Sequence, residues 1–224
     1  MAKPDRQGAV LTRRSATSLS ARTGLCLLRW PLAPGERKVT HTSNSLAEAL
    51  RREDPGALLE VARARPGRVL RYLVGRLCSA DEAEKWRAVR ALGHLVADRT
   101  LVSDTQVEEL LRRFLWALSD ESGAVPWGIP EAMAEVLLSR PEHQDRYVPI
   151  LGSCLVSDEM CQTGAIQRGV LWALGRLGHA TAEHAPHALE ALRSVAVQHE
   201  SDETRRVARQ ALDAVEVEEP ASHN

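Results

Sequence analysis

The sequence predicts an all-α protein assembled from a repeated pair of helices. Four segments align without a gap, and their first residues are spaced by 41, 41 and 38 positions: Trp86, Trp127, Arg168 and Arg206. Offsets +2, +5, +6 and +9 from each first residue are apolar, which is the stripe of one helix face. No run of residues alternates between apolar and polar side chains as a β-strand would. A helical period near 40 residues is typical of a HEAT-like α-solenoid, here with four to five helix pairs.

The four aligned segments, which we call the B helices, carry a packing signal. Alanine stands at offset +5 in every one of them, and a larger apolar residue follows at +6. A small side chain lets a neighbouring helix approach, while the larger one fills the adjacent gap. Because one such repeat cannot bury its apolar face alone, we expect the stripe to form a shared core between stacked neighbours.

Each B helix follows a candidate A helix. Apolar residues at helical spacing predict A helices over residues 69–77, 105–119, 147–156 and 182–197. An earlier helix over 46–63 is expected to act as a partial N-terminal repeat or cap. Asp104 is expected to cap the second A helix and Asp202 the last B helix, through their side-chain oxygens.

Charge divides the chain into a basic extension over residues 1–43 and a repeat domain over 44–218, followed by a disordered tail over 219–224. The first segment has a net charge of +6 and the remainder −7. Low hydrophobicity with high net charge predicts that the extension is disordered. Its composition also fits an organelle transit peptide, a basic nucleic-acid-binding tail or a stretch upstream of the true start.

The sequence lacks the patterns of secreted, membrane and metal-binding proteins. No segment approaches the roughly 20 apolar residues of a membrane span, and the four cysteines form no CxxC pair. His184 and His187 have a spacing that suits two metal ligands, but Pro186 disturbs the helix between them. We therefore expect a cytoplasmic protein with reduced thiols, no membrane contact, no metal and no cofactor.

The segment over residues 115–135 departs most from the repeat. It contains two tryptophans, and Pro130 fits the first turn of a helix. Glu131 and Glu135 lie one turn apart and share one helix face. Paired carboxylates suit acid–base chemistry or cation binding, although a solvated acidic face is the commoner arrangement.

Three motifs carry a resemblance to a known family. They are DESG at 120–123, WGIPEAM at 127–133 and QRGVLWALGRL at 167–177. Across residues 68–215 the chain resembles an uncharacterised bacterial family of HEAT-like repeat proteins. That family is typical of sulfate reducers and related anaerobes, and its repeats are related to those of phycobilin lyase HEAT proteins. The resemblance implies an α-solenoid in the cytoplasm and assigns no catalytic residue.

In HEAT-like repeats the first position of helix B usually holds an arginine that meets an acidic residue in the turn between helices. Two tryptophans replace it in the first two units of this chain. One interpretation is a hydrogen-bonded ladder between repeats that includes Asp120, Arg168 and Arg206. The other is a binding surface, since Trp and Arg predominate at binding hot spots. Its candidate residues are Trp86, Asp120, Glu121, Trp127, Glu131, Arg168 and Trp172.

The leading hypothesis for function is a non-enzymatic scaffold that binds a protein partner on its concave surface. An alternative is a cofactor-handling lyase or chaperone, which would need a deep pocket near Trp127 and Glu131 with shifted carboxylate pKa values. A third is a HEAT-like nucleic-acid-binding protein, which the acidic repeat domain disfavours. A stripe of arginines on one face would favour this third hypothesis.

Overall fold

The computed structural model describes residues 40–119, 127–156 and 164–216, and within these ranges the chain is all-α, with no strand. No described helix is both long and apolar enough to cross a membrane. In chain order the helices are α1 (Thr40–Arg51), α2 (Pro55–Ala64), α3 (Pro66–Arg76), α4 (Glu82–Ala97), α5 (Asp104–Leu118), α6 (Ile129–Ser139), the 3-10 helix η1 (Pro141–His143), α7 (Gln144–Val156), α8 (Gly164–Leu177), α9 (His179–His184), α10 (His187–Gln198) and α11 (Asp202–Glu216).

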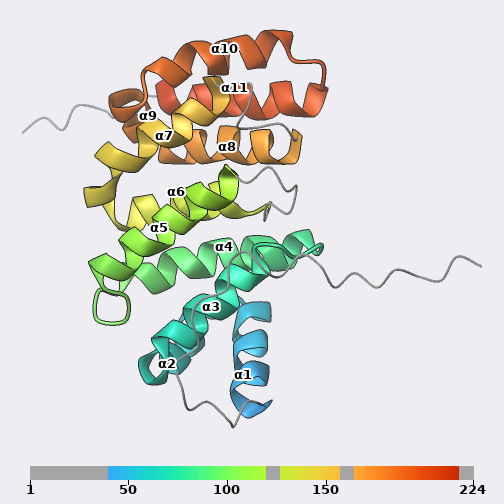
Figure 1. Ribbon diagram of the computed structural model, residues 1–224. Helices are drawn as coiled ribbons and strands as arrows, with labels where there is room; N and C mark the ends of the chain where they lie inside the picture. The colour runs from blue at the N-terminus through green and yellow to red at the C-terminus, as the bar shows by residue number, and fades with distance from the viewer. Residues whose placement is uncertain (1–39, 120–126, 157–163, 217–224) are drawn as a thin grey trace, which may run out of the picture.

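The four B helices correspond to α4, α6, α8 and α11, and they pack in chain order. Helix α4 packs on α6, α6 on α8, and α8 on α11. Most A helices lie against their own B helix, as α3 does on α4, α7 on α8 and α10 on α11. Figure 1 shows the resulting row of helices, which runs from α1 at the bottom to α10 and α11 at the top.

The apolar stripe of the B helices forms the core, as the sequence predicts. All four residues at offset +2 and all four at +9 are buried, and so are three of four at each of +5 and +6. The exceptions, Ala91 and Leu212, are partly buried and pack against the core clusters. The repeat register therefore predicts correctly which face of each helix turns inward.

Small residues bring neighbouring B helices close together. A Cβ atom on Gly175 of α8 would lie only 2.7 Å from the Cα atom of Ala211 on α11. Such a distance leaves no room for any side chain at position 175 without moving a backbone. Gly175 thus sets the spacing between the last two B helices.

The structure shows that both expected helix caps are wrong, because a different residue caps each helix. Helix α5 is capped by Ser103, which forms a capping box with Gln106, so Asp104 is the first helical residue instead. At α11, the Ser201 hydroxyl accepts from the Thr204 N–H, and Asp202 is already helical. In both cases a serine precedes the aspartate, and its shorter side chain reaches the free N–H groups of the first turn.

Two long predicted helices are each broken into two. The segment expected over 46–63 divides at Glu53, whose φ of 52° is left-handed, and α2 restarts with Asp54 as its cap. The segment expected over 182–197 divides at Ala185 into α9 and α10. A proline follows each break, and Pro55 and Pro186 cannot continue the preceding helix because they lack an N–H.

A fully buried arginine connects consecutive helix pairs. Arg140, at the end of α6, donates from Nε to the Val96 carbonyl and from Nη2 to the Val102 carbonyl, both at 2.6 Å. It also forms an ion pair with Asp104 at the start of α5. One guanidinium therefore satisfies carbonyls at the end of α4 and in the α4–α5 loop.

Candidate functional site

An open cavity of about 270 Å³ lies among the four B helices, and we call it the Trp pocket. The structure brings together five of the seven candidate residues, and all five line this pocket: Trp86, Trp127, Glu131, Arg168 and Trp172. The other two, Asp120 and Glu121, lie outside the described residues. The candidate surface thus centres on α4, α6 and α8, with α11 completing the wall.

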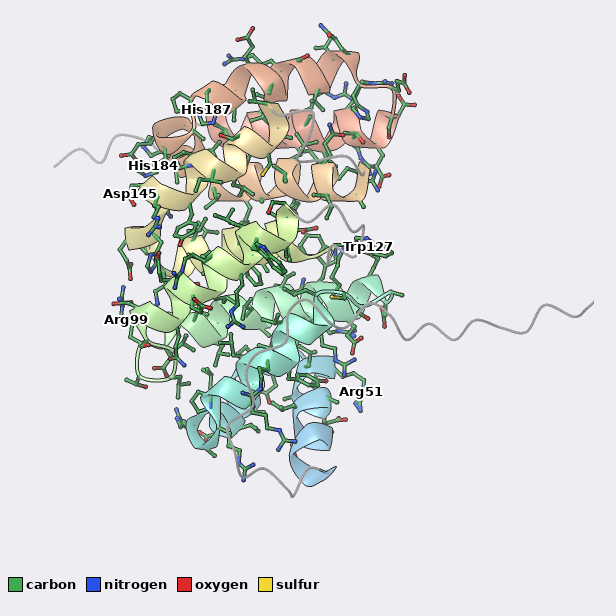
Figure 2. All side chains as sticks on the ribbon, in the orientation of Figure 1. Arg51, Arg99, Trp127, Asp145, His184 and His187 are labelled. Atoms are coloured by element: carbon green, nitrogen blue, oxygen red, sulfur yellow. The ribbon has the colours of Figure 1, made fainter. Side chains whose placement is uncertain are left out.

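Aromatic rings form two sides of the Trp pocket. Trp86 of α4 and Trp172 of α8 meet edge to face, with ring centroids 4.8 Å apart and planes 64° apart. Trp127 precedes α6 at the rim, and 49 % of it is exposed. Figure 2 shows Trp127 on the opposite side of the helix stack from His184 and Asp145 in this view. An edge-to-face pair is a favoured and well-oriented arrangement, so these two rings are held in place.

The backbone around Gly128 fixes Trp127 at the rim. The Gly128 N–H donates to the Leu77 carbonyl at 3.1 Å, which ties the start of α6 to the end of α3. A Cβ atom at Gly128 would lie 3.0 Å from Cγ of Lys85 and 3.1 Å from the Leu77 carbonyl oxygen, so the chain packs tightly at this position. The sequence predicts Trp127 as a helical residue, whereas the structure places it in the preceding turn.

Glu131 lies in the first turn of α6 and forms the polar floor of the pocket. Only 4 % of it is exposed, and its Oε2 atom has no hydrogen-bond partner among the described residues. Burial raises the pKa of this carboxyl to about 7, although the charge of Lys85 opposes the shift. Gly169 of α8 makes room for it, since a Cβ atom there would lie 2.9 Å from Oε2.

The two cations of the Trp pocket each have a carboxylate partner. Lys85 is buried, and its Nζ lies 2.8 Å from Oε2 of Glu82. The Nε of Arg168 lies 3.7 Å from Oε2 of Glu203 on α11. Of the three carboxylates that line the pocket within the described residues, Glu131 is therefore the one left without a cation at ion-pair distance.

The sequence reasoning missed six residues that line the pocket: Glu82, Lys85, Ala165, Gly169, Glu203 and Val207. Glu82 precedes Trp86 by four residues, because α4 begins one turn before the aligned segment. A residue four positions earlier lies on the same helix face as the first aligned residue. Extending the repeat alignment by one turn toward the N-terminus would therefore have included Glu82 and, at offset −3, Glu203.

Two further cavities continue from the Trp pocket along the inner side of the B helices. A cavity of about 480 Å³ shares Trp86 and Trp172 with it and reaches Glu135 and Arg176. A smaller one of about 160 Å³ shares Arg90 with the second and extends to α1 and α2. The three cavities follow one another along a single face, which we call the inner groove.

The arginines of the inner groove lie beside acidic residues. Arg87 and Arg90 share one partner, Glu53, at 3.3 and 2.7 Å. Arg176 pairs with Glu135 at 2.8 Å, and this contact raises the pKa of the guanidinium. Each of these three arginines thus already has a carboxylate partner, which a phosphate group would have to displace.

Only two of the three residues expected to form a ladder between repeats lie within the described part of the chain. Arg168 has Glu203 as its partner at 3.7 Å, Asp120 lies outside the described residues, and Arg206 is exposed on α11. The structure thus gives Arg168 a position in the pocket wall together with an acidic neighbour.

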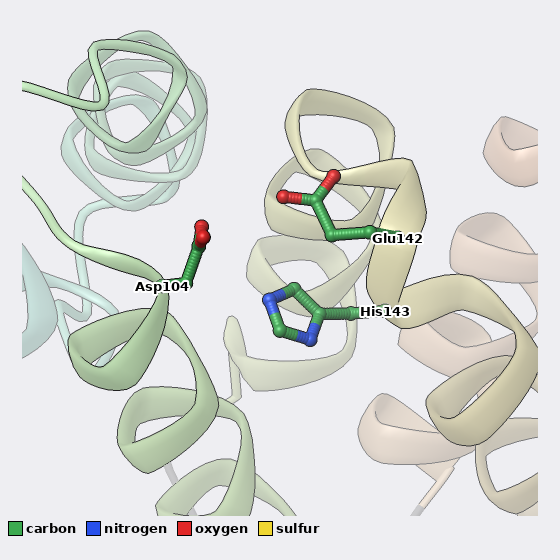
Figure 3. A group of neighbouring side chains, drawn as sticks. All are labelled: Asp104, Glu142 and His143. Carbon is green, nitrogen blue, oxygen red and sulfur yellow. The ribbon is translucent and has the colours of Figure 1, made fainter.

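A separate acidic cluster at the junction of α5 and η1 has the composition of a metal site. Asp104, Glu142 and His143 each place a ligand atom within 4.8 Å of the others, as Figure 3 shows. Arg99 already lies 2.7 Å from Glu142 and 3.1 Å from Asp104, and Arg140 also pairs with Asp104. The carboxylates that would bind a metal ion are therefore already paired with two guanidinium groups.

The histidines considered as metal ligands lie on different helices. His184 ends α9 and His187 begins α10. The Nε2 atom of His187 lies 3.3 Å from the Ser153 hydroxyl on α7. The break at Pro186 thus removes the shared helix face that two ligands at i and i+3 require.

Comparison with known proteins adds no assignment: no family model matches this chain, and no curated protein matches it.

Proposed function

We propose that the chain is a HEAT-like α-solenoid that acts as a non-enzymatic scaffold and binds a protein partner in its inner groove. The period of about 40 residues and the successive packing of α4, α6, α8 and α11 support the solenoid. The observation that carries the binding role is the Trp pocket, where Trp86, Trp127 and Trp172 gather around one open cavity. Tryptophans clustered at a concave surface are typical of binding hot spots.

The pocket composition favours binding over catalysis by an activated hydroxyl or thiol. Among the described residues that line it there is no serine, threonine, cysteine or histidine. Catalysis of the Ser–His or Cys–His type needs such side chains beside one another. Its volume of about 270 Å³ also falls short of the roughly 300–1,000 Å³ that small-molecule sites usually enclose.

One observation favours a second candidate, the cofactor-handling lyase or chaperone. The pKa of Glu131, raised to about 7 by burial, suits a general acid or base at neutral pH. The pocket beside Trp127 is the place where this hypothesis requires such a carboxyl. The other titratable groups of the pocket, Glu82, Lys85 and Glu203, already have partners of opposite charge. One carboxyl with a shifted pKa therefore supports this function less well than the cluster of tryptophans supports partner binding.

The test compares substitutions of two tryptophans with similar exposure. Trp127 is 49 % exposed at the pocket rim, and Trp116 is 55 % exposed on α5, outside the pocket. The full-length protein, its Trp127→Ala variant and its Trp116→Ala variant are immobilised, and captured polypeptides from native lysate are identified by mass spectrometry. The scaffold hypothesis requires a polypeptide that the wild type and Trp116→Ala both capture and Trp127→Ala loses.

Crosslinking then locates the captured polypeptide on the scaffold. Contacts with α4, α6 and α8 support the inner groove as the binding surface. Identical capture by all three proteins, or crosslinks confined to the A helices, would contradict the proposed function.

A further inference from the structure

We infer that the Trp pocket receives a cationic side chain, the ammonium of a lysine or the guanidinium of an arginine, from an extended segment of the protein partner. This inference rests on the proposed scaffold function and assigns the chemistry of its central contact.

The charges of the pocket leave one buried carboxylate without a cation at ion-pair distance. Lys85 is paired with Glu82, and Arg168 has Glu203 beside it. Only 4 % of Glu131 is exposed, and its Oε2 atom has no hydrogen-bond partner among the described residues. Burying a carboxylate without such a partner is destabilising, so a cation bound beside Oε2 would offset part of that cost.

The tryptophans supply the second attraction for a cation. The face of an indole ring attracts ammonium and guanidinium groups within about 6 Å of its centroid. The pocket already contains one example, because Nζ of Lys85 lies 5.5 Å from the centroid of Trp86. Trp127 and Trp172 line the same cavity as Glu131, so an incoming cation meets aromatic rings and a carboxylate together.

The size and charge of the pocket favour a side chain over a larger molecule. A cavity of about 270 Å³ suits a single long side chain, and the neighbouring cavities allow the segment that carries it to continue along the groove. An anionic side chain would meet Glu82, Glu131 and Glu203. Residues 44–224 have a net charge of −7, which steers basic segments toward the surface.

Binding of a cation is expected to depend on pH near neutrality. Burial raises the pKa of Glu131 to about 7, so this carboxyl is mostly protonated at pH 6 and mostly ionised at pH 8. The charged groups that line the pocket with it are Glu82 and Lys85 of α4, Arg168 of α8 and Glu203 of α11. A cation binds the ionised form, and we expect its affinity to rise about tenfold from pH 6 to pH 8.

The test uses small probes and the tryptophans as reporters. The full-length protein is labelled with ¹⁵N at its tryptophan indoles and titrated with Nα-acetyl-lysine N-methylamide or the corresponding arginine compound. The norleucine compound, which has the same aliphatic chain without charge, is the matched control. Both cationic probes should shift the signals of Trp86, Trp127 and Trp172, whereas the signal of Trp116, outside the pocket, should not move.

Two glutamine variants test the charge of the pocket. Glu131→Gln keeps the shape and removes the charge, and it should weaken binding of the lysine probe at pH 8 at least tenfold. Glu190→Gln removes an exposed carboxylate of α10, outside the inner groove, and it should leave binding unchanged. Equal shifts with the norleucine probe, equal binding by Glu131→Gln, or no shift with either cationic probe would overturn the inference.

The outcomes for the two proposals are distinguishable. If the cationic probes fail while Trp127→Ala still loses a captured polypeptide, the scaffold function stands and the cation inference falls. If the probes bind through Glu131 while no captured polypeptide depends on Trp127, the scaffold function falls and the cation site stands.

Discussion

Replacing Glu131 by glutamine should stabilise the protein at neutral and alkaline pH. The side chain is buried, its Oε2 atom has no hydrogen-bond partner among the described residues, and burial raises its pKa from 4.5 to about 7. Glutamine has nearly the same shape, so Glu131→Gln removes the buried charge without opening a cavity. An uncharged amide costs far less than a carboxylate to bury.

The sign and size of the effect follow from the pKa shift. The folded protein holds the Glu131 proton up to about pH 7, whereas the unfolded chain releases it near pH 4.5. The contribution of this proton to stability is therefore complete below pH 4.5 and is lost as the pH rises through 7. The shift corresponds to about 3 kcal/mol of lost stability, which the glutamine variant does not suffer.

Urea denaturation followed by circular dichroism at pH 5 and pH 8 measures the effect. The free energy of unfolding of Glu131→Gln minus that of the wild type should grow by about 2 to 3 kcal/mol between the two conditions. Glu135→Gln is the control on the same helix. It loses an ion pair with the half-exposed Arg176 and should be neutral or destabilised by up to about 1 kcal/mol. A difference for Glu131→Gln that does not change with pH would refute the assignment of a buried, proton-binding carboxyl.

Two further predictions concern the packing of the helices, and urea denaturation measures both. Arg140→Met should lower the free energy of unfolding by about 3 kcal/mol, because two buried carbonyls lose their hydrogen-bond donor. A loss below about 1 kcal/mol would contradict the role of Arg140 in connecting helix pairs. Gly175→Ala should destabilise by about 1 to 3 kcal/mol, because its Cβ atom would lie 2.7 Å from Ala211. Gly75→Ala in α3 has open space around it and should stabilise by about 0.5 to 1 kcal/mol, so equal effects at the two glycines would refute the packing argument.

The sequence predicts those parts of the fold that depend on periodicity. The B helices and their buried faces follow from one apolar stripe repeated four times, since each repeat must bury that stripe against its neighbours. The helix boundaries are less predictable because they depend on competition among neighbouring residues. Ser103 displaces Asp104 as a cap, and the breaks before Pro55 and Pro186 divide two apolar stretches that look continuous in sequence.

The candidate site is predictable in its location but not in its charges. The tryptophans at the first repeat position indicate a departure from the usual arginine, and the structure places both in one pocket with Trp172. The Glu82–Lys85 pair has the i, i+3 spacing of a contact within one helix, whereas no sequence spacing identifies the contact from Arg168 on α8 to Glu203 on α11. Only the packed structure reveals that Glu131 is left without a cation.

The repeat register explains why core and groove coexist on the same four helices. Offsets +2, +5, +6 and +9 form the buried stripe, whereas offsets 0, +4 and +8 lie on another face and supply the tryptophans of the inner groove together with Glu131, Glu135 and Arg176. At offset +8, Glu135 and Arg176 on adjacent helices pair with each other. At offset +4, the corresponding neighbours are Glu131 and Trp172, so a tryptophan stands where a cation would complete the pair. The substitution of an aromatic ring for a cation at one step of the repeat leaves both an unpaired carboxylate and an aromatic wall, which is the combination that a cationic side chain from a partner would satisfy.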